Sequence, residues 1–376
     1  MKKIKVGLIG SGEISETYLR NMTQRYNILE VVGCSDIIPE RSAERAKQFN
    51  IRNMTNEEIY NDKDIQIVVN TTYPTSHYEV TKAALLAGKH VFCEKMMAVE
   101  LHEGKELVQI AKDKNLRLGM APDTFLGAGG QTARKLIDSG LIGEPYMAVA
   151  MCVRGYHQER WPFTMYEFTR QPGGGIPFDI GGYYLHALIN LLGPVSRATG
   201  FAQSRNPDRV VQNTNHPRFG QECKVDTINA MVGSVEFANG VLGSLTFVSE
   251  GFVETPRIEI YGKEGILIVP DPNIFGGQVL LRRSGSNDFM PMPHTHGFGE
   301  NCCRSLGVAD MAWAIVNNRP HRAHGDIGYH AFEVIHGIWE CSRANKVHFM
   351  ESTCAQPAPL ASGYVEAGMD EYSLAL

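Results

Sequence analysis

The stretch IKVGLIGSGEIS, at residues 4–15, decides the fold. Its first six residues are mostly apolar, as in a buried β-strand, and the residues from Ile14 onward follow a helical pattern. Gly10, Gly12 and Ser15 lie between the two in a G-x-G-x-x-S spacing. Gly10 permits a tight turn, Gly12 lets a pyrophosphate approach the helix N-terminus, and Ser15 is small enough for close helix–strand packing. The stretch therefore predicts a dinucleotide-binding turn, with an ordinary strand-to-helix turn as the alternative.

Asp36 follows the next strand-like segment, residues 29–35, about two dozen residues after the glycines. In dinucleotide-binding folds an acidic residue at this place binds the ribose 2′-hydroxyl, and its charge repels the 2′-phosphate of NADP. We therefore predict NAD as the cofactor. Arg41, close behind Asp36, keeps NADP as the less favoured alternative.

Strand and helix patterns alternate over the first 120 residues. Strand-like segments occupy residues 3–9, 29–35, 65–71, 90–93 and 116–120, and helical patterns occupy residues 14–23, 39–49, 77–87 and 99–114. Such alternation is typical of βαβ units that build a parallel sheet. The sequence predicts an α/β protein whose N-terminal Rossmann domain spans residues 1–123.

The pattern changes after this point. Strand-like segments follow at residues 147–154, 232–237, 241–248, 257–261 and 265–269, and helical patterns at residues 132–139, 309–316 and 331–342. Turns such as Asn239–Gly240 join the strand-like segments and favour antiparallel pairing. We expect a second domain of α+β type over residues 124–355 and an extended C-terminal tail over residues 356–376.

Composition narrows the functional classes. The 376 residues carry a formal net charge of −5, which argues against a nucleic-acid partner. No apolar run is long enough to cross a membrane, and the one near the N-terminus is too short for a signal peptide. The eight scattered cysteines contain no C-x-x-C pair, which favours reduced thiols and a cytoplasmic location.

Glu94 and Lys95 directly follow the strand-like segment 90–93. Ligands bind at the carboxyl ends of the strands in open parallel sheets, so this pair is placed beside the predicted cofactor. A lysine there can hold a hydroxyl or an alkoxide, and its pKa should fall beside a cationic nicotinamide. A solvated surface ion pair is the alternative.

Asp179, Tyr183 and His186 stand four and three residues apart in a glycine-rich segment. If the segment is one helix, the three side chains lie on the same face, where they suit proton transfer to or from an alcohol. Gly181 and Gly182 each lower helix stability by about 1 kcal/mol relative to alanine, which suggests that something approaches the backbone closely. A helix cap followed by a tyrosine and a histidine in the core is the alternative.

Together these motifs make the chain resemble the Gfo/Idh/MocA oxidoreductases, the family of glucose–fructose oxidoreductase and inositol dehydrogenase. The resemblance covers nearly the whole chain and rests on residues 7–15 (GLIGSGEIS), 72–77 (TYPTSH), 87–95 (AGKHVFCEK) and 173–183 (GGGIPFDIGGY). It implies a Rossmann domain followed by a domain with a large, mostly antiparallel sheet that binds substrate and forms homo-oligomers. It also implies hydride transfer between a nicotinamide cofactor and a secondary alcohol of a sugar, polyol or glycoside.

The resemblance implies roles for individual residues. Lys95 matches the family's catalytic-site lysine and Asp179 the acid of its second motif, while Tyr183 stands where many members have a histidine base. His186 stands where an Asp or Asn often contacts substrate, and Asp123 occupies a position that is basic in many members. The residues predicted to bind the cofactor are Gly10, Gly12, Glu13, Ile14, Asp36, Thr72, His77, Glu94 and Lys95.

Two departures from the family pattern concern the reaction centre. Met96 replaces the proline of the usual Glu-Lys-Pro, whose Lys–Pro bond is often cis in relatives. A cis bond before a residue other than proline is about 2.5–4 kcal/mol less stable than trans. We therefore expect a trans Lys95–Met96 bond with a shifted loop, or else a strained cis bond. Tyrosine instead of histidine at Tyr183 leaves open whether Tyr183 or Lys95 is the immediate base.

The substrate is less well defined by the sequence. Asp123, Tyr156, Arg160 and Trp161 are candidates for a polar, aromatic pocket that fits a hexose or glycoside. Residues 304–312 (RSLGVADMA) resemble a branch of glycoside-linked family members. Oxidation of a glycoside to its 3-keto form is therefore the specific prediction.

Two alternatives to a dehydrogenase stay open. One is a glycosidase that uses tightly held NAD for transient oxidation, and the other is an NAD-binding sensor without catalytic activity. His294 and His296 have metal-ligand spacing but no third ligand, and Cys302–Cys303 has no ligand spacing. We therefore predict no metal site.

Overall fold

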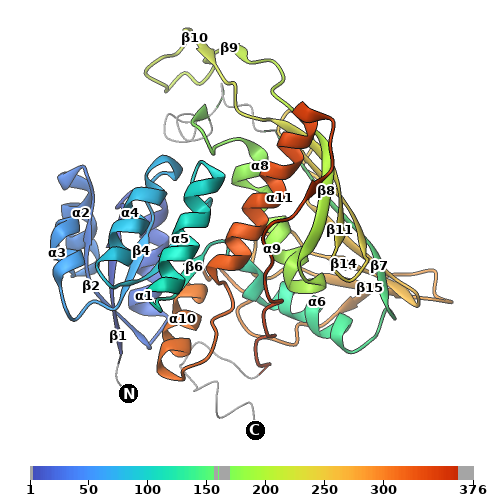
Figure 1. The fold of residues 1–376 in the computed structure, drawn as a ribbon, viewed down its shortest axis with the longest axis horizontal. Coiled ribbons are helices and arrows are strands. Elements are labelled where there is room, and N and C mark those ends of the chain that lie inside the picture. Colours follow the sequence, from blue (N-terminus) through green and yellow to red (C-terminus); the bar gives the residue numbers. More distant parts are fainter. Residues whose placement is uncertain (1–2, 156–159, 161–169, 363–376) are drawn as a thin grey trace.

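The computed structural model describes residues 3–155, 160 and 170–362, which form two neighbouring sheets with helices around and between them (Figure 1). The first sheet has six strands in the order β3-β2-β1-β4-β5-β6, all paired in parallel. These strands are β1 (Ile4–Ile9), β2 (Leu29–Ser35), β3 (Arg52–Asn53), β4 (Ile67–Asn70), β5 (His90–Cys93) and β6 (Leu118–Met120). Strands β1 and β4 are almost wholly buried apolar runs, as strands covered on both faces must be. The predicted Rossmann fold is confirmed.

Helices cover both faces of this sheet. Helices α1 (Glu13–Gln24) and α2 (Pro39–Phe49) contribute to one buried cluster, and α3 (Asn56–Asn61), α4 (Pro74–Leu86) and α5 (Leu101–Asp113) contribute to another. Helix α10 (Leu306–Val316), from much later in the chain, packs in the same cluster as α1. The domain boundary at residue 123 stays a prediction, because this later helix helps to cover the first sheet.

The second sheet has nine strands in the order β16-β15-β14-β13-β7-β12-β11-β8-β17. Neighbours pair antiparallel except β7 and β12, which are parallel, so the large, mostly antiparallel sheet is confirmed. Gly240, with a φ of +86°, turns the chain from β11 into β12 as predicted. The strands are β7 (Pro145–Val153), β8 (Val195–Gln203), β11 (Ala230–Phe237), β12 (Leu242–Val248), β13 (Arg257–Gly262), β14 (Gly265–Val269), β15 (Val279–Arg283), β16 (Met290–Met292) and β17 (His348–Phe349).

Figure 1 shows helices α8, α9 and α11 between the two sheets. They are α8 (Ile176–Asp179), α9 (Gly181–Leu192) and α11 (Gly325–Ala344), and the short helix η1 (Thr124–Leu126) and α6 (Ala128–Asp138) pack beside α9. Every residue of α9 is buried. A small two-stranded sheet, β9 (Asp208–Val210) with β10 (Glu222–Lys224), projects at the top of Figure 1. None of the helices in the described ranges is both long and apolar enough to cross a membrane.

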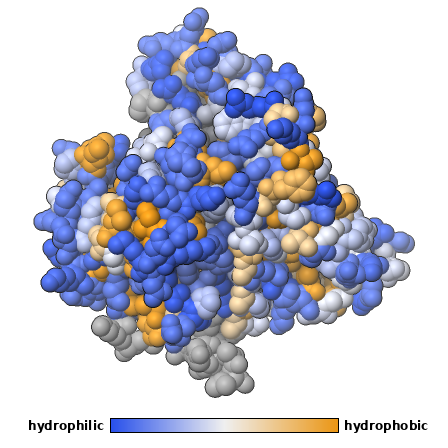
Figure 2. Space-filling view, in the orientation of Figure 1, coloured by the Kyte–Doolittle hydropathy of each residue, from blue (hydrophilic) through white to orange (hydrophobic). Residues whose placement is uncertain are grey.

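The face of the nine-stranded sheet that is turned away from the helices exposes apolar side chains, among them Phe201 on β8 and Val232 on β11. Figure 2 shows apolar residues near β8 and the end of α11, and others over the helices that cover the first sheet. Such a patch on a protein surface is typical of an interaction site.

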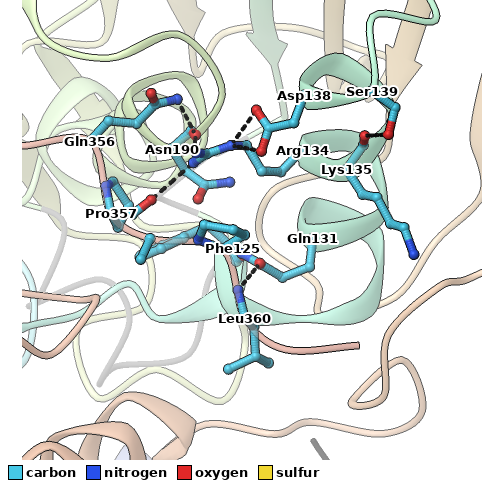
Figure 3. Close-up of polar contacts among 12 residues, drawn as sticks. Phe125, Gln131, Arg134, Lys135, Asp138, Ser139, Asn190, Gln356, Pro357 and Leu360 are labelled. Atoms are coloured by element: carbon cyan, nitrogen blue, oxygen red, sulfur yellow. Dashed lines mark hydrogen bonds and ion pairs between the residues drawn. The ribbon is translucent and has the colours of Figure 1, made fainter. Parts of the chain in front are cut away.

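Residues 350–362 run without helix or strand along α6 and α9 (Figure 3). The Arg134 guanidinium on α6 donates to the carbonyl oxygens of Asn190 (2.8 Å) and Pro357 (2.9 Å). The Leu360 N–H donates to the Gln131 side chain at 2.7 Å. These contacts fix the segment against the helices that carry the candidate site.

Candidate active site

The turn between β1 and α1 has the backbone geometry of an anion site. Gly10 has a φ of +100°, and a Cβ there would lie 2.6 Å from the backbone of Thr71, so only glycine fits. Gly12 caps α1, and a Cβ built on it meets nothing within 4 Å. The Ser15 hydroxyl donates to the Gly12 carbonyl at 2.5 Å and closes the first turn of the helix. The open space over the helix N-terminus can receive a pyrophosphate.

Asp36 lies beside this turn, directly after β2. Its carboxylate accepts the N–H groups of Ser11 (2.6 Å) and Ile38 (2.8 Å), which fix its orientation. A carboxylate offers about four acceptor sites, so capacity for a ribose hydroxyl remains. Glu13 is exposed and Ile14 half-buried in the first turn of α1. The structure therefore brings these predicted cofactor residues together around one turn.

His77 joins two loops at the carboxyl edge of the sheet. Its ring nitrogens contact the carbonyl oxygens of Met96 (2.6 Å) and Thr72 (2.9 Å), and the side chain is only 1% exposed. The Thr72 hydroxyl in turn donates to Asn70 at 2.7 Å. With both ring nitrogens engaged, His77 positions the loops after β4 and β5, and its contact with the cofactor stays a prediction. The Lys95–Met96 bond in the second loop is cis, so the trans alternative is wrong.

The loop after β5 brings three of the predicted catalytic residues together. The Lys95 Nζ atom lies 3.1 Å from the Asp179 carboxylate and 5.7 Å from the centre of the Tyr183 ring. Glu94, predicted to contact the cofactor, is buried beneath them and accepts hydrogen bonds from the Tyr18 hydroxyl (2.6 Å) and the Lys95 N–H (3.1 Å). A cation, a carboxylate and a phenol therefore converge at the carboxyl end of a parallel strand, where open α/β sheets bind ligands.

The charges in this cluster stabilise one another. Burial alone would lower the pKa of Lys95, but Tyr183, Asp179 and Glu94 outweigh it and the pKa is raised. Burial alone would raise the pKa of Glu94, but Lys95 and Arg304 outweigh it and the pKa is lowered. The fall of the Lys95 pKa expected beside a cationic nicotinamide stays a prediction.

Asp179 and Tyr183 lie on two successive helices, whereas the predicted shared face assumed a single helix. The helix is interrupted at Ile180, which is the C-cap of α8 and the N-cap of α9. A Cβ on Gly181 would come within 3.2 Å of the Phe247 ring, and one on Gly182 within 3.3 Å of the Met96 sulfur. The close approach predicted from these glycines is thus made by side chains of the protein itself, including one from the Lys95 loop.

Arg304 is a member of the cluster that sequence reasoning missed. Its Nη2 group donates to the Tyr183 hydroxyl at 2.7 Å and to the Asn273 side chain at 3.3 Å. Residues 304–312 had been singled out by resemblance, but no local spacing connects Arg304 with a residue so distant in the chain. The signal that was available is an arginine directly before a buried apolar helix.

Two further predicted residues, His186 and Asp123, are buried and have hydrogen-bond partners within the protein. His186 is 2% exposed, and its Nδ1 atom lies 3.0 Å from the Pro122 carbonyl. Because a carbonyl only accepts, Nδ1 carries the proton, and burial lowers the pKa of His186 to about 4, so the ring is neutral. Asp123 is 1% exposed and accepts the Gly307 N–H at 2.8 Å. Asp123 therefore contacts α10, and its assignment to the substrate pocket stays a prediction.

Of the other predicted substrate residues, Arg160 is described by the structure and has a partner outside the cluster. Arg160 is exposed, and its guanidinium donates to Gln212 at 3.1 Å. Tyr156 and Trp161 lie outside the described residues.

The remaining motifs have structural explanations. The His294 ring contacts the Gly277 carbonyl (2.8 Å), and the His296 ring contacts the Leu360 carbonyl (2.9 Å). Within the described part of the chain, no group of three His, Cys, Asp or Glu residues is arranged to hold a metal ion. All eight cysteines are free, and only Cys302 is exposed.

Comparison with known proteins gives the same assignment for both halves of the chain. Residues 4–121 match the family described as "Oxidoreductase family, NAD-binding Rossmann fold", and residues 131–268 match the "GFO/IDH/MocA C-terminal domain". Levoglucosan dehydrogenase of Pseudarthrobacter phenanthrenivorans is 27% identical over 292 residues, which are 71% of this chain and 74% of that protein. The 1,5-anhydro-D-fructose reductase of Ensifer adhaerens is 29% identical over 297 residues, 76% of this chain and 82% of that protein.

Two further relatives extend this picture. The inositol 2-dehydrogenase/D-chiro-inositol 3-dehydrogenase of Lactiplantibacillus plantarum is 31% identical over 164 residues, 41% of this chain and 44% of that protein. A solved structure of levoglucosan dehydrogenase in complex with NADH and L-sorbose has a TM-score of 0.79 at 22% identity and covers 94% of this chain and all of that one. At this identity the likeness shows a shared fold.

The fold and the site together define an oxidoreductase that binds NAD. The chain belongs to the Gfo/Idh/MocA family. The residues present fit the cofactor, since Gly12 leaves space over the N-terminus of α1 and Asp36 stands beside it with acceptor capacity for a ribose hydroxyl.

Proposed function

We propose that the chain is an NAD-dependent dehydrogenase that oxidises a secondary alcohol of a sugar, polyol or glycoside, and that C3 of a glycoside is the carbon oxidised. The named relatives support the first part, since they are dehydrogenases or reductases of levoglucosan, inositol and 1,5-anhydrofructose. Levoglucosan, an anhydro sugar with an internal glycosidic bond, supports the second part.

One observation carries the proposal. Lys95 lies 3.1 Å from Asp179 and 5.7 Å from the Tyr183 ring, at the edge of the sheet where the cofactor turn opens. Bound NAD supplies the acceptor for the hydride that leaves the alcohol carbon. Asp179 orients the Lys95 ammonium, which donates to the substrate oxygen and stabilises the developing alkoxide. Tyr183 is placed to accept the hydroxyl proton, a role that in enzymes contributes about 10²–10⁴-fold to the rate.

The test follows NADH absorbance with levoglucosan, methyl glucosides and myo-inositol. We expect turnover by the full chain, and losses of at least about 10²-fold in kcat for Tyr183→Phe and for Lys95→Ala. Tyr146→Phe and Lys105→Ala are matched controls, because Tyr146 is 53% exposed on the outer sheet and the Lys105 side chain is 66% exposed on α5.

Three results would contradict the proposal. Full hydride-transfer rates in both site variants would remove the assigned roles. Release of free sugar without net NADH would favour the glycosidase alternative, and NAD binding without any turnover would favour the sensor.

A further inference from the structure

We propose that Arg304 is a positioning residue that holds the Tyr183 oxygen and stabilises its deprotonated form, so that Tyr183 and not Lys95 takes the substrate proton. This inference rests on the proposed function and settles which of the two residues is the immediate base. It assigns to Arg304 a role in the reaction that the family motifs do not contain.

The hydrogen-bond partners of Arg304 include the Tyr183 oxygen. Its guanidinium donates to the Tyr183 hydroxyl (2.7 Å), the Asn273 amide oxygen (3.3 Å) and the Cys302 thiol (3.4 Å). Among the described residues, all of its hydrogen-bond partners are uncharged. Besides Tyr183, the charge of the buried Glu94 helps to raise the pKa of Arg304, and the shortest hydrogen bond of the guanidinium goes to the Tyr183 oxygen. A negative charge that forms on this oxygen is therefore stabilised directly by Arg304.

The hydroxyl group of Tyr183 is buried together with its proton. The phenol is 3% exposed and its oxygen already accepts from Arg304. Within the described residues the hydroxyl proton has no acceptor, and a buried donor without an acceptor lowers stability by about 1–3 kcal/mol. The deprotonated phenol keeps the hydrogen bond from Arg304 and leaves no donor unsatisfied. A substrate hydroxyl entering the site would therefore meet an oxygen suited to take its proton.

Lys95 is less suited than Tyr183 to act as the base. Its ammonium lies 3.1 Å from Asp179 and 3.9 Å from Glu94. These carboxylates and the phenol raise the pKa of Lys95 although burial opposes them, so the group stays protonated and acts as a donor. Lys95 and Arg304 thus place two cations beside the phenol, one 5.7 Å from the ring centre and one on its oxygen.

The position of Arg304 is fixed from the cofactor side. Asn21 on α1 donates to the carbonyl oxygens of Cys302 (2.9 Å) and Arg304 (2.7 Å), and the Tyr26 hydroxyl donates to the Cys303 carbonyl (2.7 Å). The segment 302–304 is therefore held by α1 and the residues just after it. The helix whose N-terminus receives the pyrophosphate also determines where the guanidinium meets the phenol.

Several titratable groups lie around the two cations beside the phenol. They are Lys95 with its neighbours Glu94 and Asp179, and Arg304 with its neighbours Glu94, Cys302 and Tyr18. Arg304 is the one among them whose hydrogen bond reaches the phenol oxygen. Replacing Arg304 should therefore change the pH at which the phenolate forms, while the other groups stay in place.

The experiment compares the full chain with Arg304→Gln and Arg304→Lys. The ultraviolet difference titration of each, minus the same protein carrying Tyr183→Phe, isolates the phenolate of Tyr183. We expect Arg304→Gln to move its formation upward by at least about one pH unit, a tenfold change, and Arg304→Lys to move it less. The limb in which kcat/KM for levoglucosan and NAD rises with pH should move upward by the same amount, with activity recovering at high pH.

Arg283→Gln is the matched control, since the Arg283 side chain is 49% exposed and pairs with Glu264 on the surface. NADH fluorescence titration and thermal unfolding show whether each variant is folded. An unchanged titration in Arg304→Gln overturns the inference. So does a loss confined to the KM of a glucuronide, because Arg304 would then bind a substrate carboxylate. If the titration moves but the wild type oxidises no alcohol, the proposed function fails and the contact with Tyr183 stands.

Discussion

Gly12 shows how a single missing side chain defines the cofactor turn. A Cβ at this position would meet no protein atom within 4 Å, and its backbone, with a φ of −74°, suits any residue. We therefore expect Gly12→Val to fold normally but to fill the space over the N-terminus of α1. NADH affinity should fall by more than about tenfold, or 1.4 kcal/mol, with an unchanged melting temperature. Fluorescence titration measures the first and thermal unfolding the second. Gly12→Ala should have a smaller effect, and wild-type affinity in both variants would contradict the assignment.

The residues of the site differ in how far the sequence could predict them. Lys95, Asp179 and Tyr183 belong to motifs with fixed spacing, and the structure places them together. Arg304 is 121 residues from the phenol that it contacts, and no local pattern marks such a pair. His186 shares a helix face with Tyr183, but spacing alone does not reveal that its ring is held by the Pro122 carbonyl.

At the scale of elements, burial decides which strands the sequence pattern predicts. Strands β1, β4 and β5 are buried apolar runs and were predicted, as were β7 and β11 to β14 in the second sheet. Strand β8 (VSRATGFAQ) was missed, because its inward residues are small and its outward ones mixed, and pairing with β11 makes it a strand. The short β15, β16 and β17 were missed for a related reason: each depends on a neighbouring strand already in place.

The contact of Asp123, just before η1, with α10 should make the stability of the protein depend on pH. Burial raises the pKa of Asp123 to about 6, against the opposing hydrogen bond from the Gly307 N–H and the charge of Arg304. The folded protein therefore binds this proton more tightly than the unfolded chain, and stability falls as pH rises from about 4 to about 6.

Asp123→Asn removes this titration while its amide oxygen can still accept from Gly307. Relative to the wild type, the variant should gain up to about 3 kcal/mol in the free energy of unfolding above pH 6, and nothing near pH 4. Urea denaturation at a series of pH values measures the difference. Parallel pH dependences of the two proteins would show that Asp123 does not titrate in this range.

At the scale of the whole molecule, the site depends on contacts between distant parts of the chain. The first sheet supplies Lys95, helices α8 and α9 supply Asp179 and Tyr183, and the segment before α10 supplies Arg304. Alternating patterns were sufficient to predict both kinds of sheet. They did not predict that α10 returns to the first sheet, because that packing is set by complementary apolar surfaces rather than by any local period.

The outer face of the nine-stranded sheet makes the last prediction. Two exposed apolar pairs lie on the face without helices, Phe201 (74% exposed) with Val232 (54%) and Leu242 (57%) with Met147 (39%), with Ser234 and Ser244 between them. Exposed apolar residues that gather on one face mark interaction sites. We therefore predict a homo-oligomer that buries this face, as light scattering coupled to size-exclusion chromatography would measure.

Val232→Glu and Phe201→Glu should shift the protein towards the monomer. In a two-fold dimer the same patch lies on both subunits, so each substitution places two carboxylates in one apolar interface. Leu86→Glu adds the same charge at an apolar residue that is 54% exposed on α4, at the first sheet, and should leave the mass unchanged. A wild-type monomer at micromolar concentration would refute the prediction. Because the helices that carry the reaction cluster pack on the inner face of this sheet, the monomeric variants should also show whether activity requires assembly.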